Sequence, residues 1–102
     1  MLRVITFTTR EEKMKGISGM SPVPKDALFV FQDLEQGSYF HSQGVLEDFE
    51  IVFLNDRKEP MYFAVMHPER QLAIIPAGAT TAVESAVGVI SGLGFRALAS
   101  IL

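Results

Sequence analysis

The chain has no cysteine among its 102 residues, which excludes disulfides, thiolate metal sites and cysteine nucleophiles together. It is also poor in cations: only nine Lys and Arg residues are scattered along it, and its net charge is −3. Because proteins bind phosphate backbones with clustered cations, we do not expect nucleic acid as a partner.

Long apolar runs are missing as well. Residues 1–7 lack the basic region and the apolar stretch of a signal peptide. The apolar C-terminal segment 86–102 has 17 residues and is interrupted by Arg96 and three glycines. A membrane-spanning helix needs about 20 predominantly apolar residues, so we expect no signal peptide and no membrane partner.

What the chain does contain is apolar sequence in short runs. Hydrophobic residues make up 48% of it and charged residues 21%, which is typical of a folded protein, and the length predicts a single domain over 1–102. Apolar runs of strand length, several with alternating faces, predict seven short strands, at 2–8, 27–31, 38–43, 49–54, 61–66, 72–75 and 95–101.

Two short helices are predicted from capping boxes, in which a Thr or Ser is followed three residues later by Glu. Thr9 with Glu12 opens a helix over 10–17, and Thr81 with Glu84 opens a second one before a glycine-rich turn. These elements together predict a small β-rich α+β domain, built as a curved mixed sheet or a partial barrel.

Six short motifs occur in order along the chain, at 15–20, 26–31, 40–45, 49–54, 76–78 and 88–92. They include Asp-Ala-Leu-Phe-Val-Phe at the second segment, Pro-Ala-Gly at the fifth and Gly-Val-Ile-Ser-Gly at the last. In this order and spacing they resemble the motifs of DUF192, a family of small uncharacterised domains found in bacteria, archaea and some phages. The resemblance covers almost the whole chain.

The chain departs from that family where the family is polar. The Arg, Trp, Lys, Asn, Glu and Asp of the family pattern are replaced by Met20, His41, Gln43, Gly44, Ile74 and Leu93. Replacing Lys by Gln removes a charge that binding or catalysis would use. The resemblance therefore implies a retained scaffold that has lost the small-molecule site of its relatives, with no cofactor and no enzymatic activity.

Our leading hypothesis from the sequence is a structural or protein–protein interaction module that acts within an oligomer or larger assembly. The segments 61–66 and 72–75 are apolar on both faces, which indicates cover on both sides, and a second chain can supply it. The phage relatives suggest a virion component, so the expected location is the cytoplasm or a virion. The expected interface residues are Met61, Phe63, Leu72, Ile74, Leu93 and Phe95.

One alternative is a domain that binds a small polar ligand such as a sugar. His41, Gln43 and Arg70 carry the polar groups that would form this site near one strand end.

A second alternative is a metal-assisted hydrolase, because imidazole and carboxylate groups bind zinc, iron or manganese. The candidate residues are the two histidines and the acids near them in sequence, His41, Glu47, Asp48, His67 and Glu69. Their spacing matches no recognised metal site, so we assign no metal ligand. Glu47, Asp48 and Glu50 are candidates for acid–base catalysis, but three acids at a strand entrance are more simply a solvated rim, and we assign no catalytic residue.

Overall fold

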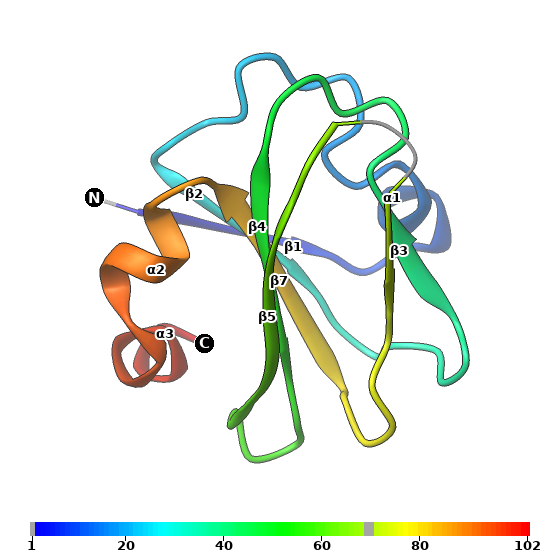
Figure 1. The fold of residues 1–102 in the computed structure, drawn as a ribbon. Coiled ribbons are helices and arrows are strands. Elements are labelled where there is room, and N and C mark those ends of the chain that lie inside the picture. Colours follow the sequence, from blue (N-terminus) through cyan, green and yellow to red (C-terminus); the bar gives the residue numbers. More distant parts are fainter. Residues whose placement is uncertain (1, 69–70) are drawn as a thin grey trace.

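A computed structural model describes residues 2–68 and 71–102. This part of the chain forms a small β-rich α+β domain, as predicted, with seven strands and three short helices (Figure 1). The elements are β1 (Arg3–Phe7), α1 (Arg10–Lys15), β2 (Ala27–Phe31), β3 (Tyr39–His41), β4 (Phe49–Leu54), β5 (Pro60–Met66), β6 (Leu72–Ile74), β7 (Thr81–Ala86), α2 (Val89–Leu93) and α3 (Phe95–Ile101).

Five strands form one mixed sheet in the order β1-β2-β7-β4-β5. β1 pairs with β2 in parallel, and the other neighbours are antiparallel. Of the two arrangements expected from the sequence, the open mixed sheet is the one that forms, with β1 and β5 as its edges. β3 and β6 pair with each other in a separate antiparallel sheet.

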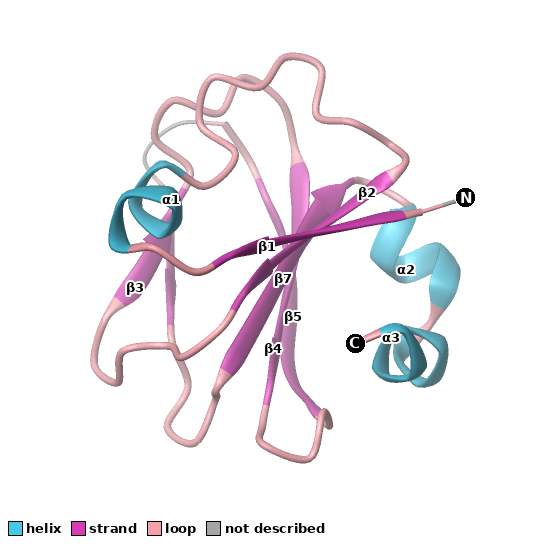
Figure 2. Ribbon diagram, turned by 180° about the vertical axis from the view of Figure 1, so that it is seen from behind, coloured by secondary structure: helices cyan, strands magenta, loops and turns pink. Residues whose placement is uncertain are grey.

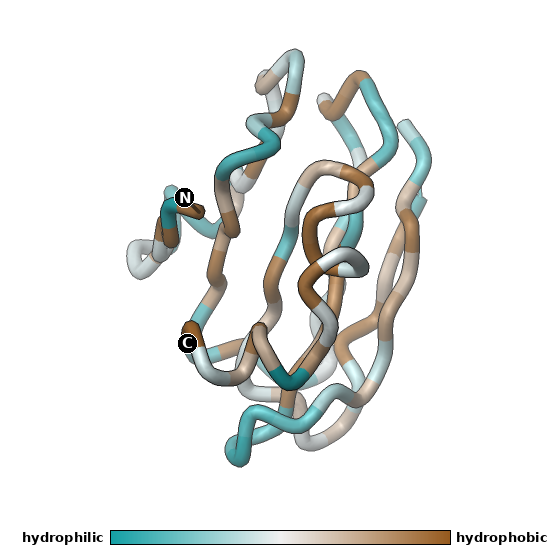
Figure 3. The backbone as a smooth tube through the Cα atoms, turned by 90° about the vertical axis from the view of Figure 1, so that its left-hand side faces the viewer, coloured by the Kyte–Doolittle hydropathy of each residue, from teal (hydrophilic) through white to brown (hydrophobic). Residues whose placement is uncertain are grey.

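Both faces of the five-stranded sheet are covered. α1 and the β3–β6 pair lie on one face, and α2 and α3 lie on the other (Figures 1 and 2). Alternation along β4 supplies both cores: Phe49, Ile51 and Phe53 face the α1 side, while Val52 and Leu54 face α2 and α3. Viewed from the α2–α3 side, hydrophobic segments concentrate in the strands and hydrophilic ones in the loops (Figure 3).

A chain of phenylalanines holds the small β3–β6 sheet against the large one. Phe40 of β3 makes edge-on contacts with Phe31 and Phe53, at centroid distances of 4.9 and 5.6 Å. Phe31 makes a similar contact with Phe7 of β1 at 5.1 Å. Such pairs contribute about 0.5–1.5 kcal/mol each beyond the area they bury, so this contact fixes where β3 lies relative to the sheet.

The helix predicted at Thr81 is wrong, because this segment is β7, the central strand of the sheet. β7 pairs with β2 on one side and β4 on the other. Thr81 and Val83 are β-branched and suit a strand, and the hydrogen bonds of two neighbouring strands outweigh a local capping pattern. By contrast, the first capping box forms: Thr9 accepts from the Glu12 amide at the start of α1.

The strand predicted over 95–101 is also wrong, because this segment is helix α3. Leu98 and Leu102 lie four residues apart and pack into the core beneath the helix, where Leu98 is fully buried. That spacing is the helical period, and Ala97 and Ala99 beside Leu98 are strong helix formers. Two of the glycines predicted to form a turn flank another short helix, α2, which covers the same face.

Candidate ligand-binding cleft

Glu84 is the one acidic side chain that β7 brings into the protein interior. Its cross-strand neighbours are Phe29 and Ile51, and it shares a face with Ala82 and Ala86, which belong to the core on the α1 side. The residue is only 3% exposed. Within the described residues, no group forms a hydrogen bond or an ion pair with its carboxyl, and burial raises the pKa of Glu84 to about 8.

The Glu84 carboxyl faces a cleft between α1 and β3, with a volume of about 720 Å³. This volume lies within the range of small-molecule sites, which is roughly 300–1,000 Å³. Phe31 and Glu84 form its floor, and its apolar walls include Ile17, Phe40, Val45 and Ile75. A neutral carboxylic acid at the bottom of a largely apolar cleft can both donate and accept a hydrogen bond.

Gly16 lets the chain pass directly over this floor. A Cβ atom at this position would lie 3.3 Å from the Phe31 ring and 3.9 Å from Oε1 of Glu84, and Gly16 has a φ of +50°. Both the close approach and the positive φ favour glycine here. The end of α1 therefore borders the carboxyl without a side chain between them.

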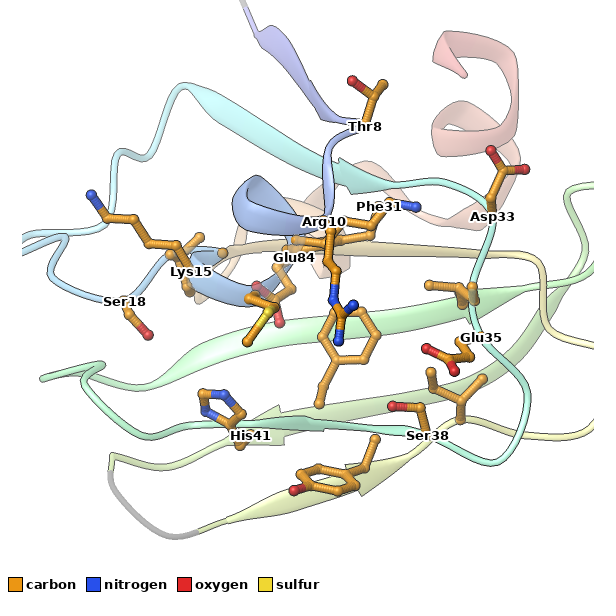
Figure 4. Close-up of a pocket in the computed structure, with 18 of the residues that line it drawn as sticks. Thr8, Arg10, Lys15, Ser18, Phe31, Asp33, Glu35, Ser38, His41 and Glu84 are labelled. Atoms are coloured by element: carbon orange, nitrogen blue, oxygen red, sulfur yellow. The ribbon is translucent and has the colours of Figure 1, made fainter.

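Charged side chains surround the cleft. Figure 4 shows the Arg10 side chain reaching over it from α1, with His41 pointing in from β3 and Glu35 from the loop after β2. The ends of Lys15 and Asp33 point away from the centre (Figure 4).

Backbone groups of β3 add further polar atoms to the cleft wall. The Ser42 amide donates to Gln71, and the Ser38 carbonyl accepts from Ile75, so these residues pair with β6. Antiparallel pairing alternates, so the amide and carbonyl groups of Tyr39 and His41 point to the opposite edge. That edge borders the cleft, where these groups are available to a ligand.

One end of the cleft is closed by contacts between two loops. The Ser18 hydroxyl donates to the Gln43 carbonyl at 2.8 Å, and the Gly19 amide donates to the Gly44 carbonyl at 3.0 Å. These bonds hold the segment after α1 against the segment after β3. The width of the cleft is thus set by the loops as well as by Phe40.

Of the ligand-binding residues predicted from the sequence, His41 lines the cleft. Gln43 lies just beyond it, with an exposed side chain and a backbone amide that donates to Nδ1 of His41 at 3.2 Å. Arg70 lies outside the described residues, as does Glu69 of the metal hypothesis.

Glu50 belongs to neither the solvated rim nor the cleft, which corrects its predicted place. It is 2% exposed and lies on the sheet face that carries α2. Its carboxylate accepts from the amides of Gly88 and Ser91 and from the Ser91 hydroxyl, at 2.8, 3.0 and 2.7 Å. Burial alone would raise the pKa of Glu50, but these bonds outweigh it and lower the pKa. The residue holds α2 on the sheet.

The other predicted metal and acid–base residues lie apart from one another. Asp48 and His67 form an exposed pair at 3.0 Å, while Glu47 accepts a hydrogen bond from the Val23 amide. Within the described residues, no three His, Asp or Glu side chains come close enough to hold a metal.

The predicted interface residues divide into two groups. Phe63 of β5 and Leu93 of α2 are partly buried and pack against the core between the sheet and helices α2 and α3. The others are exposed, by 39% to 75%: Met61, Leu72, Ile74 and Phe95. Separately, in the described part of the chain no helix has the length and apolar character needed to cross a bilayer.

Glu84 was missed as a site residue because the sequence was interpreted there as a helix. The signal was available in Thr-Ala-Val-Glu-Ser-Ala, a run of small and β-branched residues with one acid on the face of the alanines. In a strand this alternation places Glu84 on the core face, whereas the capping-box interpretation makes it the acid that caps the start of a helix.

No protein-family model and no curated protein sequence matches this chain. Two solved structures share its fold. A protein of unknown function from Novosphingobium aromaticivorans aligns with a TM-score of 0.77 and 16% identity, over 91% of this chain and 69% of its own. A protein from Sinorhizobium meliloti, provisionally assigned as a transcription regulator, aligns with a TM-score of 0.66 and 13% identity, over 91% and 74%. At these identities the comparisons show the fold alone.

Proposed function

We propose that this domain binds a small molecule in the cleft between α1 and β3. The single observation that carries the proposal is Glu84: a residue that is only 3% exposed, whose carboxyl forms no hydrogen bond or ion pair with the described residues and opens into a cleft. Among the described residues, every side-chain oxygen that is fully enclosed has a hydrogen bond, so the Glu84 carboxyl, which has none, is open to the cleft and calls for a partner there. A ligand that bonds to Glu84 supplies one.

The composition of the cleft supports the same proposal. Small-molecule sites combine apolar and aromatic walls with a few converging polar groups, and strongly shifted pKa values gather in them. Here the aromatic groups are Phe31 on the floor and Phe40 on a wall, and the polar groups are Glu84, Arg10 and His41. This is the polar-ligand alternative of the sequence analysis, centred on Glu84 rather than on Gln43 and Arg70.

A fragment screen by two-dimensional amide NMR tests the proposal directly. Fragments that bind should shift the resonances of Gly16, Phe31, His41 and Glu84 together, because these residues surround one cleft. Hits should raise the melting temperature, since a ligand at about 100 times its dissociation constant adds about 2.7 kcal/mol of stability.

Two variants separate specific binding from general effects. Glu84→Leu removes the hydrogen-bonding group while keeping a buried side chain of similar size, and should abolish binding of the hits. Asp56→Asn removes an exposed acid on the hairpin between β4 and β5, and should leave binding unchanged. A broad screen that shifts no cleft resonance, or hits that bind Glu84→Leu as tightly as the wild type, would refute the proposal.

We also propose, as a second candidate, self-association through the outer face of the β3–β6 sheet. Leu72 and Ile74 point outward and are 62% and 75% exposed, and Tyr39, opposite Ile74, is 55% exposed. Exposed apolar groups gathered on one face favour an interaction surface. Self-association through this face would use two of the predicted interface residues, Leu72 and Ile74. Such contacts between copies of the chain would suit a virion or another large assembly.

Sedimentation velocity tests the second candidate. The wild type should show a concentration-dependent shift toward a dimer, and Leu72→Ser with Ile74→Ser should abolish it. Leu46→Ser is a matched control, because Leu46 is 65% exposed and lies in the loop before β4. A wild type that stays monomeric at high concentration would remove this candidate without affecting the cleft.

A further inference from the structure

The cations that α1 contributes to the cleft have no acidic partner in the described part of the chain. Arg10 and Lys13 both line the cleft, and neither forms an ion pair. Of the two acids on the same helix, Glu11 does not line the cleft, and the Glu12 carboxylate accepts from the Thr8 and Thr9 amides, both at 3.0 Å. The α1 wall is therefore a cationic surface with unused donors.

The groups facing Glu84 differ in charge from wall to wall. α1 contributes Arg10 and Lys13 to the lining, with Lys15 at the margin, while β3 contributes His41. The segment after β2 contributes the acids Asp33 and Glu35, and of these Glu35 points into the cleft (Figure 4). A ligand thus meets positive charge on the helix side, the Glu35 carboxylate on the loop side and a neutral acid on the floor.

We propose that the ligand is a small organic anion, with its acidic group against Arg10 and Lys13 and an uncharged hydrogen-bonding end at Glu84. This inference rests on the proposed function and names the class of ligand. A carboxylate or phosphate can accept charge-assisted hydrogen bonds from the α1 cations. A hydroxyl or carbonyl group at the other end matches the donor and acceptor of the protonated Glu84 carboxyl.

A cationic ligand fits these walls less well. An amine placed at Glu84 would require that carboxyl to lose its proton inside an apolar site, and it would face Arg10 and Lys13 across the cleft. Like charges in a partly desolvated site repel strongly. The ring of Phe31 on the floor and that of Phe40 on the wall favour a flat ligand body between the two polar ends.

Three matched probes of one size test the ligand class: 4-hydroxyphenylacetate, 4-hydroxyphenylacetamide and tyramine carry an anionic, a neutral and a cationic end on the same phenol. Binding is followed by NMR titration of the cleft resonances at about pH 7 and about pH 9. We expect the anion to bind at least about tenfold more tightly than the amide, and the amine to bind most weakly. Affinity for the anion should fall about tenfold at the higher pH, because Glu84 then carries a repelling charge.

Two variants assign these effects to residues. Arg10→Gln should weaken binding of 4-hydroxyphenylacetate by about tenfold and leave binding of 4-hydroxyphenylacetamide unchanged, because only the anion forms a charge-assisted hydrogen bond with the guanidinium. Glu84→Gln should still bind the anion but lose the pH dependence, because an amide does not titrate. Asp56→Asn serves again as the distant control.

The outcomes distinguish this inference from the proposed function. Tightest binding by tyramine, with affinity that rises with pH, would overturn the anion assignment while leaving a ligand-binding cleft. Equal binding of the anion by wild type and Arg10→Gln would do the same. If neither these probes nor the broad screen shifts a cleft resonance, the proposed function and this inference both fail.

Discussion

Replacing Glu84 by Gln should stabilise the protein at neutral pH, and by an amount that depends on pH. Gln is close to Glu in shape, keeps a donor and an acceptor, and cannot ionise. In the folded wild type, burial holds the pKa of Glu84 at about 8, against a usual value of 4.5. In the unfolded chain the carboxyl ionises freely above 4.5, so ionisation favours unfolding.

The size and sign of the effect follow from linkage. Between about pH 4.5 and about pH 8 the folded state holds one more proton than the unfolded state, so the free energy of unfolding falls as pH rises. The slope is about 1.4 kcal/mol per pH unit, which gives a loss of about 3 kcal/mol by pH 7 and about 5 kcal/mol over the whole interval. Native domains are stable by only about 5–15 kcal/mol, so the effect is measurable.

Urea unfolding followed by circular dichroism, at several values from about pH 5 to about pH 9, provides the assay. The stability difference between Glu84→Gln and the wild type should grow with pH and level off above about pH 8. Asp56→Asn should show no such trend, because Asp56 is exposed. A constant difference across this range would refute the argument, because Glu84 would then ionise equally in both states.

Three further changes test the supports of the cleft and of the opposite face. Glu50→Ala should destabilise the fold by about 3 kcal/mol in urea unfolding, because it leaves the amides that hold α2 without their acceptor. Glu50→Gln should lose less stability than the wild type as pH falls below about 4.5, because the stability that the lowered pKa of Glu50 provides is lost progressively as the pH falls from that value through the folded pKa. Gly16→Ala should cost about 1–3 kcal/mol, from the positive φ and the contact with Phe31, whereas Gly19→Ala, also at positive φ but with open space around it, should cost less. Thr9→Ala should cost about 1 kcal/mol by removing the cap of α1, seen as a lower melting temperature.

The sequence predicted those parts of the fold whose local pattern and tertiary environment agree. The segment 27–31 is an unbroken apolar run of strand length, and 49–54 is interrupted only by Glu50; both form strands buried on both faces. The first capping box formed because α1 lies at the surface, where no neighbouring strand competes with it. The open sheet order, by contrast, depends on long-range pairing that no local pattern reports.

The C-terminal third could not be predicted in the same way because local and tertiary preferences conflict there. Thr81 and Glu84 have the spacing of a capping box, yet the gap between β2 and β4 is filled by their segment as a strand. Once β7 occupies that gap, the segment 95–101 is free to fold as a helix whose buried residue, Leu98, packs on the sheet. The wrong helix predicted at Thr81 and the wrong strand predicted over 95–101 therefore have a common cause.

The candidate site was predictable only in its outer part. His41 was identified because histidine is rare in this chain and lies near a strand end. Arg10 and Lys13 resembled the ordinary solvated face of a charged helix, and nothing local indicates that β3 lies opposite them. The resemblance to DUF192 remains a prediction. It implies that a polar site has been lost, but that implication rests only on the positions of the family's own motifs. Glu84 was not among them.

The two buried glutamates show why Glu84 requires a functional explanation and Glu50 does not. They lie on adjacent strands and on opposite faces of one sheet, and both are at most 3% exposed. Glu50 receives three hydrogen bonds that fix α2, and its pKa is lowered, so its charge stabilises the fold. Glu84 receives none from the described residues, and its burial opposes folding above about pH 4.5. A destabilising group at the floor of an accessible cleft supports the proposal that a ligand, rather than the protein itself, supplies the hydrogen-bonding partner of Glu84.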